Sequence, residues 1–267
     1  MLFRLVRIVR TRNLWVFIVN YSRGKRRKKL RLFAQPLNVH YRVPKLINSV
    51  LDALPSRADY LEVGIFEGST FQNVIADERW GVDVDPAFDT TVLPRNSRVF
   101  VQTSDSFFAE LPIEKKFDMV YIDAEHTFEQ AYRDLVAAMN HLKPKGVVLL
   151  DDTVPEDEIA SIPNEKDSKI EVKRVHGKTI WPHQGDVWKL ILQVSQSHPE
   201  LEVRSVLEGS RPRTIMWRRS QVLEEINVEA TDGVEKLSYR EAFASGIPKE
   251  FGVKPLAEIL DEIRQRH

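Results

Sequence analysis

The chain of 267 residues contains no cysteine, which excludes disulfides, thiolate nucleophiles and cysteine-ligated zinc. Long apolar runs are missing too. The run near the amino terminus, Leu14–Val19, is far shorter than the roughly 20 residues that span a bilayer. Arginines interrupt the apolar residues before it, so no clear cleavable signal is indicated. The composition is that of a soluble globular protein with one substantial core and additional segments.

Acidic residues are absent from residues 1–51, which hold 13 of the 39 lysines and arginines. The remainder therefore carries 26 basic and 39 acidic residues, so a formal net charge of zero conceals a positive head and a negative body. In the head, apolar and basic residues interleave with Trp15 and Phe17, and a basic run follows at 23–29. We therefore expect residues 1–35 to form a basic amphipathic segment.

Three interpretations of the head stay open. Residues 1–33 could contact an anionic membrane surface, pack on the acidic body, or bind nucleic acid, for which no motif is found. We expect a cytoplasmic protein without a nucleic-acid partner, peripheral on the inner face of a membrane if the head binds there. A homo-oligomer is also left open.

The body alternates between strand and helix patterns, which predicts an α/β fold. We expect a Rossmann-like doubly wound sheet, mainly parallel, with a C-terminal antiparallel hairpin strand. The domain would span residues 36–220, followed by a helical tail at 221–267. The polar stretch 153–186 is long enough to be a lid or a binding loop. Strands are expected at 59–63, 80–85, 98–102, 117–123, 147–150, 202–207 and 213–217, and helices at 43–54, 68–77, 127–142, 186–197 and 256–266.

The first strand runs into a glycine turn, Glu62-Val-Gly64-Ile-Phe-Glu-Gly68-Ser69. Glycine lets a backbone approach a ligand closely, and the acid at the strand end favours a cationic ligand over a pyrophosphate. Ligands of open α/β sheets bind at the carboxyl ends of strands. The acids that fall on such ends are Glu62, Asp83, Asp123, Asp151 and Asp152.

This order of strand, acid, glycine turn and second strand ending in Asp83 resembles the class I S-adenosylmethionine-dependent methyltransferases. The resemblance implies that Asp83 binds the ribose hydroxyls, that Asp105 accepts from the adenine amine, and that Glu62 lies near the methionine ammonium. The full set of cofactor-binding residues that it implies is Glu62, Gly64, Gly68, Ser69, Asp83, Asp105 and Asp123.

Two further stretches are Phe117-Asp-Met-Val-Tyr-Ile-Asp-Ala-Glu-His-Thr-Phe128 and Leu142-Lys-Pro-Lys-Gly-Val-Val-Leu-Leu-Asp-Asp152. With Gly185-Asp-Val-Trp-Lys189 they resemble the metal-dependent sugar O-methyltransferases of the macrocin and aminocoumarin type, over about residues 58–192. The sequence departs from that pattern at Ala124, Phe128 and Lys145. Three carboxylates repel one another unless a cation joins them, so Asp123, Asp151 and Asp152 are expected to hold a divalent ion, Mg²⁺ first.

Two residues compete for the role of general base. His126 has the better ordinary pKa, whereas the family resemblance favours Asp123. Trp181 and His183 could line an acceptor pocket or pack within the lid. We expect an O-methyltransferase that acts on a hydroxyl of a sugar or glycoconjugate. Two alternatives stay open: methylation of a soluble natural product or phenol, and a binding module without catalysis.

Overall fold

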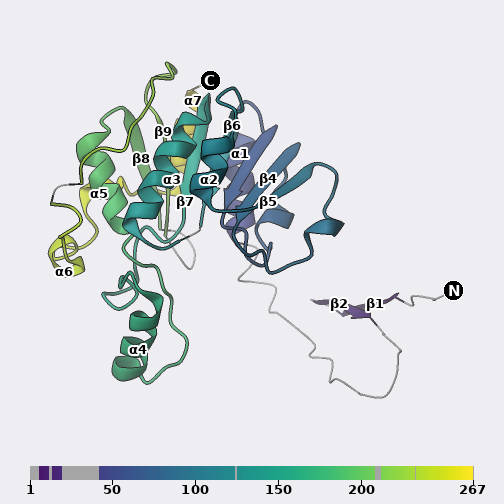
Figure 1. Cartoon of the computed structure of the whole chain (residues 1–267), viewed down its shortest axis with the longest axis horizontal. Helices are drawn as coiled ribbons and strands as arrows, with labels where there is room; N and C mark the ends of the chain where they lie inside the picture. The colour runs from purple at the N-terminus through teal and green to yellow at the C-terminus, as the bar shows by residue number, and fades with distance from the viewer. Residues whose placement is uncertain are drawn as a thin grey trace.

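The structure is a computed structural model that describes residues 6–11, 14–19, 42–123, 125–207, 212–231 and 233–266. At its centre lies a seven-stranded sheet with the order β5-β4-β3-β6-β7-β9-β8 (Figure 1). The parallel strands are β3 (Asp59–Val63), β4 (Glu78–Asp83), β5 (Ser97–Val101), β6 (Phe117–Ile122) and β7 (Leu142–Leu150). An antiparallel hairpin, β8 (Leu201–Val206) and β9 (Arg213–Arg218), completes the sheet through β9. The predicted Rossmann-like fold is confirmed.

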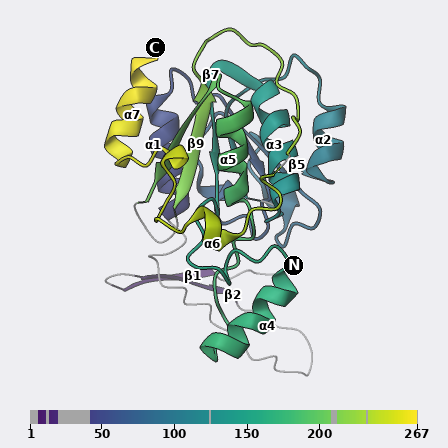
Figure 2. The same cartoon turned by 90° about the vertical axis from the view of Figure 1, so that its left-hand side faces the viewer.

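Helices cover both faces of this sheet (Figure 2). One face packs against α2 (Ser104–Glu110), α3 (Phe128–Asn140) and α5 (Trp188–Ser197), and the other against α1 (Arg42–Ala53) and α7 (Leu256–Gln265). Residues of the central strand β6 alternate between the layers: Val120 and Ile122 join the first cluster, Met119 and Tyr121 the second. Burial on both faces explains why this strand is almost continuously apolar.

The chain after β9 contributes to both layers. Ile226, Val234 and Phe251 are buried in the cluster around α3 and α5, while Ile259 and Ile263 of α7 pack in the cluster around α1. This part of the chain also contains two short elements before α7, which are α6 (Tyr239–Ala242) and the 3-10 helix η3 (Lys249–Phe251). The predicted C-terminal helix is thus present and packs on α1.

The helix predicted over residues 68–77 is wrong, because the structure has only the 3-10 turn η1 (Phe71–Asn73) there. The buried Arg79 guanidinium donates to the carbonyls of Phe71, Gln72 and Val74 at 3.1, 3.1 and 3.2 Å. These contacts satisfy carbonyls that an α-helix would use itself, so the single turn is stable without continuing. A second short turn, η2 (Thr90–Val92), follows β4.

The strand predicted over 147–150 is longer than expected, since β7 begins at Leu142. Its pairing with β6 shifts register: Phe117 lies opposite Leu142, whereas Met119 lies opposite Val147. The extra residues of β7 form an irregularity that accommodates Pro144 within a strand, where proline is otherwise disfavoured.

A helix that the sequence interpretation lacked lies in the polar stretch 153–186. This helix, α4 (Glu165–His176), projects from the layered body in both views (Figures 1 and 2). Asn164 caps it by accepting from the backbone amides of Lys166 and Asp167, and Gly177 ends it with a φ of 61°. These are the usual start and stop residues of a helix.

Within residues 1–35, only the backbone of two strands is described. β1 (Val6–Thr11) and β2 (Leu14–Val19) pair as an antiparallel hairpin. The other residues of the predicted segment 1–35 lie outside the described residues. Among the described helices, none has the length and apolar character needed to cross a membrane.

Candidate active site

The glycine turn after β3 adopts the conformation that the sequence implied. Gly64 and Gly68 have φ values of 87° and 70°, where side chains cause strain, and Phe66 between them also has a positive φ of 37°. Asp83, the last residue of β4, holds this turn through its carboxylate. Its Oδ2 accepts from the amides of Ile65 and Phe66 at 2.9 and 2.8 Å. Asp83 therefore positions the loop and still reaches the partly exposed edge of the sheet.

Apolar side chains flank this acid at the surface. Phe66 is 65% exposed and Val84 is 64% exposed, although both are large apolar residues. Exposed apolar groups beside a carboxylate suit a ligand with a flat ring and neighbouring hydroxyls. Neither residue was singled out from the sequence; their signal was an apolar residue directly beside the predicted turn and strand end.

Glu62 lies deeper than the other candidate residues, with an exposed fraction of only 1%. The hydroxyl of Tyr60 donates to its carboxylate at 2.6 Å. Burial raises the pKa of Glu62 well above its usual range, although the Tyr60 hydrogen bond opposes the shift. Its contact with a methionine ammonium stays a prediction.

Asp105 lies at the start of α2, where residues of α3 hold it. Arg133 approaches it at 3.3 Å, and the amide of Gln130 donates to the same carboxylate at 3.3 Å. Ser69 follows Gly68 in the glycine turn, and its carbonyl accepts from the side-chain amide of Asn73 at 2.9 Å. The structure thus distributes the predicted cofactor residues along one sheet edge, on the turn after β3, the end of β4 and the start of α2.

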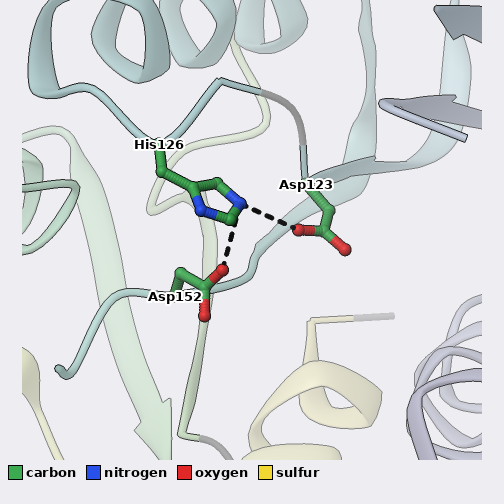
Figure 3. Close-up of side chains that lie close together, drawn as sticks. All are labelled: Asp123, His126 and Asp152. Atoms are coloured by element: carbon green, nitrogen blue, oxygen red, sulfur yellow. Dashed lines mark ion pairs between the residues drawn. The ribbon is translucent and has the colours of Figure 1, made fainter. Parts of the chain in front are cut away.

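Three side chains converge at the carboxyl ends of β6 and β7 (Figure 3). His126 Nε2 lies 3.2 Å from Asp152 Oδ2 and 3.6 Å from Asp123 Oδ1. One ligand atom from each of these residues lies within 4.8 Å of the others. Asp152 has a φ of 56°, a strained conformation for a residue with a side chain that is frequent at functional sites.

The electrostatics of this group favour a charged histidine. Burial lowers the pKa of His126, but the hydrogen bond to Asp123 and the charges of Asp152, Asp123 and Asp151 outweigh it and raise the pKa to about 9. Burial likewise raises the pKa of Asp123, and its interactions with His126 and Tyr121 reverse that shift to below the usual value. At neutral pH, His126 is therefore an imidazolium between two carboxylates.

Asp151 does not join this group, although the sequence placed it in the same ligand set. Its Oδ2 accepts from Arg213 Nε and an Arg213 terminal nitrogen at 3.1 and 2.9 Å and from the Tyr121 hydroxyl at 2.7 Å. The same hydroxyl lies 3.1 Å from Asp123, so Tyr121 links the two acids. Sequence reasoning missed Arg213, for which the signal was a charged residue opening the strand predicted at 213–217.

A cavity of about 560 Å³ opens beside His126. It is lined by Glu125, His126, Thr127, Pro163, Asn164, Glu165 and His183. The His183 ring stacks on His126 with centroids 5.4 Å apart, and burial lowers the pKa of His183. Trp181 does not line this cavity: its ring stacks on His176 at 4.4 Å and its Nε1 donates to Asp157 at 3.4 Å.

The last residues of the stretch 153–186 contact the segment that carries His126. Gly185 has a φ of 61°, and a Cβ placed there would lie 1.7 Å from the His126 carbonyl oxygen. The next residue, Asp186, accepts from the Phe128 amide at 2.8 Å and so caps α3. Gly185 and Asp186 therefore set the distance between the lid and the chain that carries His126.

Comparison with known families decides what this site belongs to. Residues 49–153 match a family model described as a methyltransferase domain. The matched range contains the glycine turn, Asp83, Asp105 and the group of Asp123, His126 and Asp152, whereas the lid and His183 lie outside it. A comparison with curated proteins found no match.

Solved structures share the fold of the methyltransferase domain at low sequence identity. A candidate O-methyltransferase from Klebsiella pneumoniae has a TM-score of 0.50 and 15% identity, covering 69% of this chain and 84% of its own. An O-methyltransferase from Bacillus cereus in complex with SAH has a TM-score of 0.47 and 14% identity, covering 66% and 79%. CalS10, an amino pentose methyltransferase from Micromonospora echinaspora, has a TM-score of 0.35 and 20% identity, covering 42% and 50%. At 15% identity, the likeness to the Klebsiella pneumoniae structure shows the fold alone.

Proposed function

We propose that the protein is an S-adenosylmethionine-dependent O-methyltransferase that acts on a hydroxyl of a sugar or glycoconjugate, assisted by Mg²⁺. One observation supports this most directly: a histidine held between two carboxylates faces a cavity at the carboxyl edge of a methyltransferase domain. A histidine and a carboxylate arranged in this way can bind a hydroxyl and remove its proton.

The residues of the sheet edge fit the donor. The Gly64–Gly68 turn allows close approach of the backbone, Asp83 offers carboxylate oxygens to ribose hydroxyls, and Phe66 and Val84 expose apolar surface for adenine. S-adenosylmethionine supplies an electrophilic methyl group on its sulfonium when bound. Asp105, fixed by Arg133 and Gln130, would accept from the adenine amine.

His126 is the better candidate for the base. Its pKa of about 9 leaves only a small fraction of His126 neutral at neutral pH, but this neutral form is a strong proton acceptor, whereas Asp123 has a lowered pKa and is a weak one. As the acceptor oxygen bonds to the methyl carbon and the carbon–sulfur bond breaks, the hydroxyl proton passes to a nitrogen of His126. Asp123 and Asp152 then stabilise the imidazolium. Much of the acceleration comes from holding the two reactants in line.

The side chains of this group also fit a divalent ion, with fewer ligand residues than the three acids that the sequence suggested. Asp123 and Asp152 would hold Mg²⁺ with oxygen ligands, and His126 lies within reach. Asp151 would contribute only if it exchanged Arg213 for the ion. When bound, the ion would lower the pKa of the acceptor hydroxyl.

Methyl transfer can be followed by mass spectrometry with a donor that carries a trideuterated methyl group. Free sugars, glycolipids and catechols serve as acceptors, with and without Mg²⁺ and a chelator. We expect one labelled methyl on a sugar-containing acceptor and loss of transfer in His126→Gln. Transfer to phenols alone would overturn the acceptor class, and full activity in chelator would overturn the role of Mg²⁺. Absence of transfer to every acceptor, with no donor binding, would overturn the function.

A further inference from the structure

The lid contains an arm, defined here as residues 163–181, that leaves the body and returns to it. Both views show α4 of this arm projecting beyond the layers of helices and sheet (Figures 1 and 2). One side of α4 is fastened inward: Ser168 and Val172 are buried, and the Ser168 hydroxyl donates to the Ile159 carbonyl at 3.0 Å. The Trp181 ring stacks on His176 and so fixes the segment that returns from α4 to the body.

The arm also exposes aliphatic side chains. Ile170 is 63% exposed, and Ile180, in the turn after the helix, is 86% exposed. Ile170 lies two residues from each of the buried pair Ser168 and Val172, which places it on the far side of the helix. The two isoleucines give the projecting arm aliphatic surface that can contact an apolar partner.

Basic residues surround these isoleucines. Lys166 and Lys173 lie four and three residues from Ile170, on the same face of α4, and Lys178 lies two residues before Ile180. The arm holds five lysines and arginines against three acidic residues, although the chain after residue 51 is strongly acidic. Two of the acids pair within the helix, Glu165 with Lys169 and Glu171 with Arg174, both at 2.6 Å. Lys166 and Lys173 remain as exposed cations, whereas the Lys178 ammonium lies 4.5 Å from the centroid of the Trp181 ring.

We propose that the arm is a contact site for an anionic lipid bilayer, with Ile170 and Ile180 at the headgroup boundary and Lys166 and Lys173 facing anionic headgroups. The positive charge of the arm complements such a surface, while the acidic body is repelled from it, which orients the protein. A nucleic acid would also attract the lysines but offers no apolar layer for the isoleucines.

The position of the arm links this surface to the active-site cavity. Pro163, Asn164 and Glu165 at the base of the arm form one wall of the cavity that opens beside His126. A bilayer in contact with the arm would therefore present the headgroup of a lipid-linked acceptor to that cavity. This last step rests on the proposed function, whereas the bilayer contact itself does not.

Co-sedimentation of the full-length protein with vesicles tests the proposal. The probes are phosphatidylcholine vesicles with and without phosphatidylglycerol. The arm variants are Lys166→Glu with Lys173→Glu, and Ile170→Ser with Ile180→Ser. Their controls are Lys236→Glu and Ile113→Ser, which change equally exposed residues away from the arm: the Lys236 side chain is 84% exposed and Ile113 is 62% exposed.

We expect binding that depends on phosphatidylglycerol, weakened at least about tenfold by the lysine reversals and severalfold by the serine pair, with the controls unchanged. Arm variants that bind vesicles as tightly as the controls would overturn the proposal, as would wild-type protein that binds no vesicles. Loss of RNA binding rather than vesicle binding would replace the bilayer with nucleic acid. Calorimetry with S-adenosylmethionine on the same proteins reports folding, and a wild type that binds vesicles but no donor would overturn only the proposed function.

Discussion

Replacing Gly185 by alanine should disturb both the stability of the protein and its active site. Gly185 and Gly177 share a φ of 61°, so alanine at either position bears the same conformational strain, about 1–2 kcal/mol. They differ in surroundings: nothing lies within 4 Å of a Cβ at Gly177, whereas a Cβ at Gly185 would lie 1.7 Å from the His126 carbonyl oxygen. Gly177→Ala is therefore a matched control that isolates the steric effect.

The clash involves backbone rather than a movable side-chain end, so the segment that carries His126 has to shift by more than an ångström. We expect Gly185→Ala to lower the free energy of unfolding by about 3 kcal/mol or more beyond Gly177→Ala, because overpacking of this kind typically costs about 1–3 kcal/mol even in adaptable cores. Urea unfolding of the two variants and the wild type measures this difference. Equal losses in both variants would refute the idea that Gly185 sets the position of His126.

Two further predictions concern charges of the site. The pKa of His126 is raised from 6.5 to about 9, so the stability that its charged form contributes is complete below pH 6.5 and is lost as the pH rises through 9. In urea unfolding with a chelator present, the free energy of unfolding of the wild type should fall by about 2–3 kcal/mol more over that interval than that of His126→Gln. Parallel pH dependences of the two proteins would contradict this prediction. Arg213→Met leaves Asp151 buried without its cation and should lower the free energy of unfolding by about 3–5 kcal/mol. Adding Asp151→Asn should restore much of this loss, and no recovery in the double variant would show that the two residues do not act as a pair.

The sheet could be predicted from the sequence because its strands are short, apolar and separated by turn residues. The strand 59–63 was predicted with the bounds that β3 has, and its neighbours were within a few residues. The helix predicted at 68–77 is wrong because the side chain of Arg79, in the following strand β4, satisfies carbonyls of that segment. Such tertiary competition is invisible to local periodicity.

The arm was missed for a different reason. Its apolar residues do not repeat at helical spacing, since only Ser168 and Val172 face inward. Asn164 before the helix and Gly177 after it were nevertheless readable signals, because they cap helices through local geometry rather than through packing. Capping residues would have found α4 where periodicity did not.

The site was predicted in its residues more completely than in its contacts. Strand ends place Asp123, Asp151 and Asp152 at one edge, which the order of strands alone implies. The choice of partners depended on residues far away in the sequence: Arg213 binds Asp151, and His126 binds Asp152. Pairing between strand ends and a hairpin some sixty residues later requires the fold itself.

Calorimetric titration with S-adenosylmethionine tests the central claim most directly, since every role proposed for the sheet edge requires this ligand. The wild type should bind one molecule per chain, and Asp83→Asn should weaken binding at least about tenfold because a ribose acceptor and three contacts with backbone amides are altered together. Asp85→Asn, two residues away and exposed, is the control and should bind as the wild type does. An absence of binding heat in the folded wild-type protein would contradict the account.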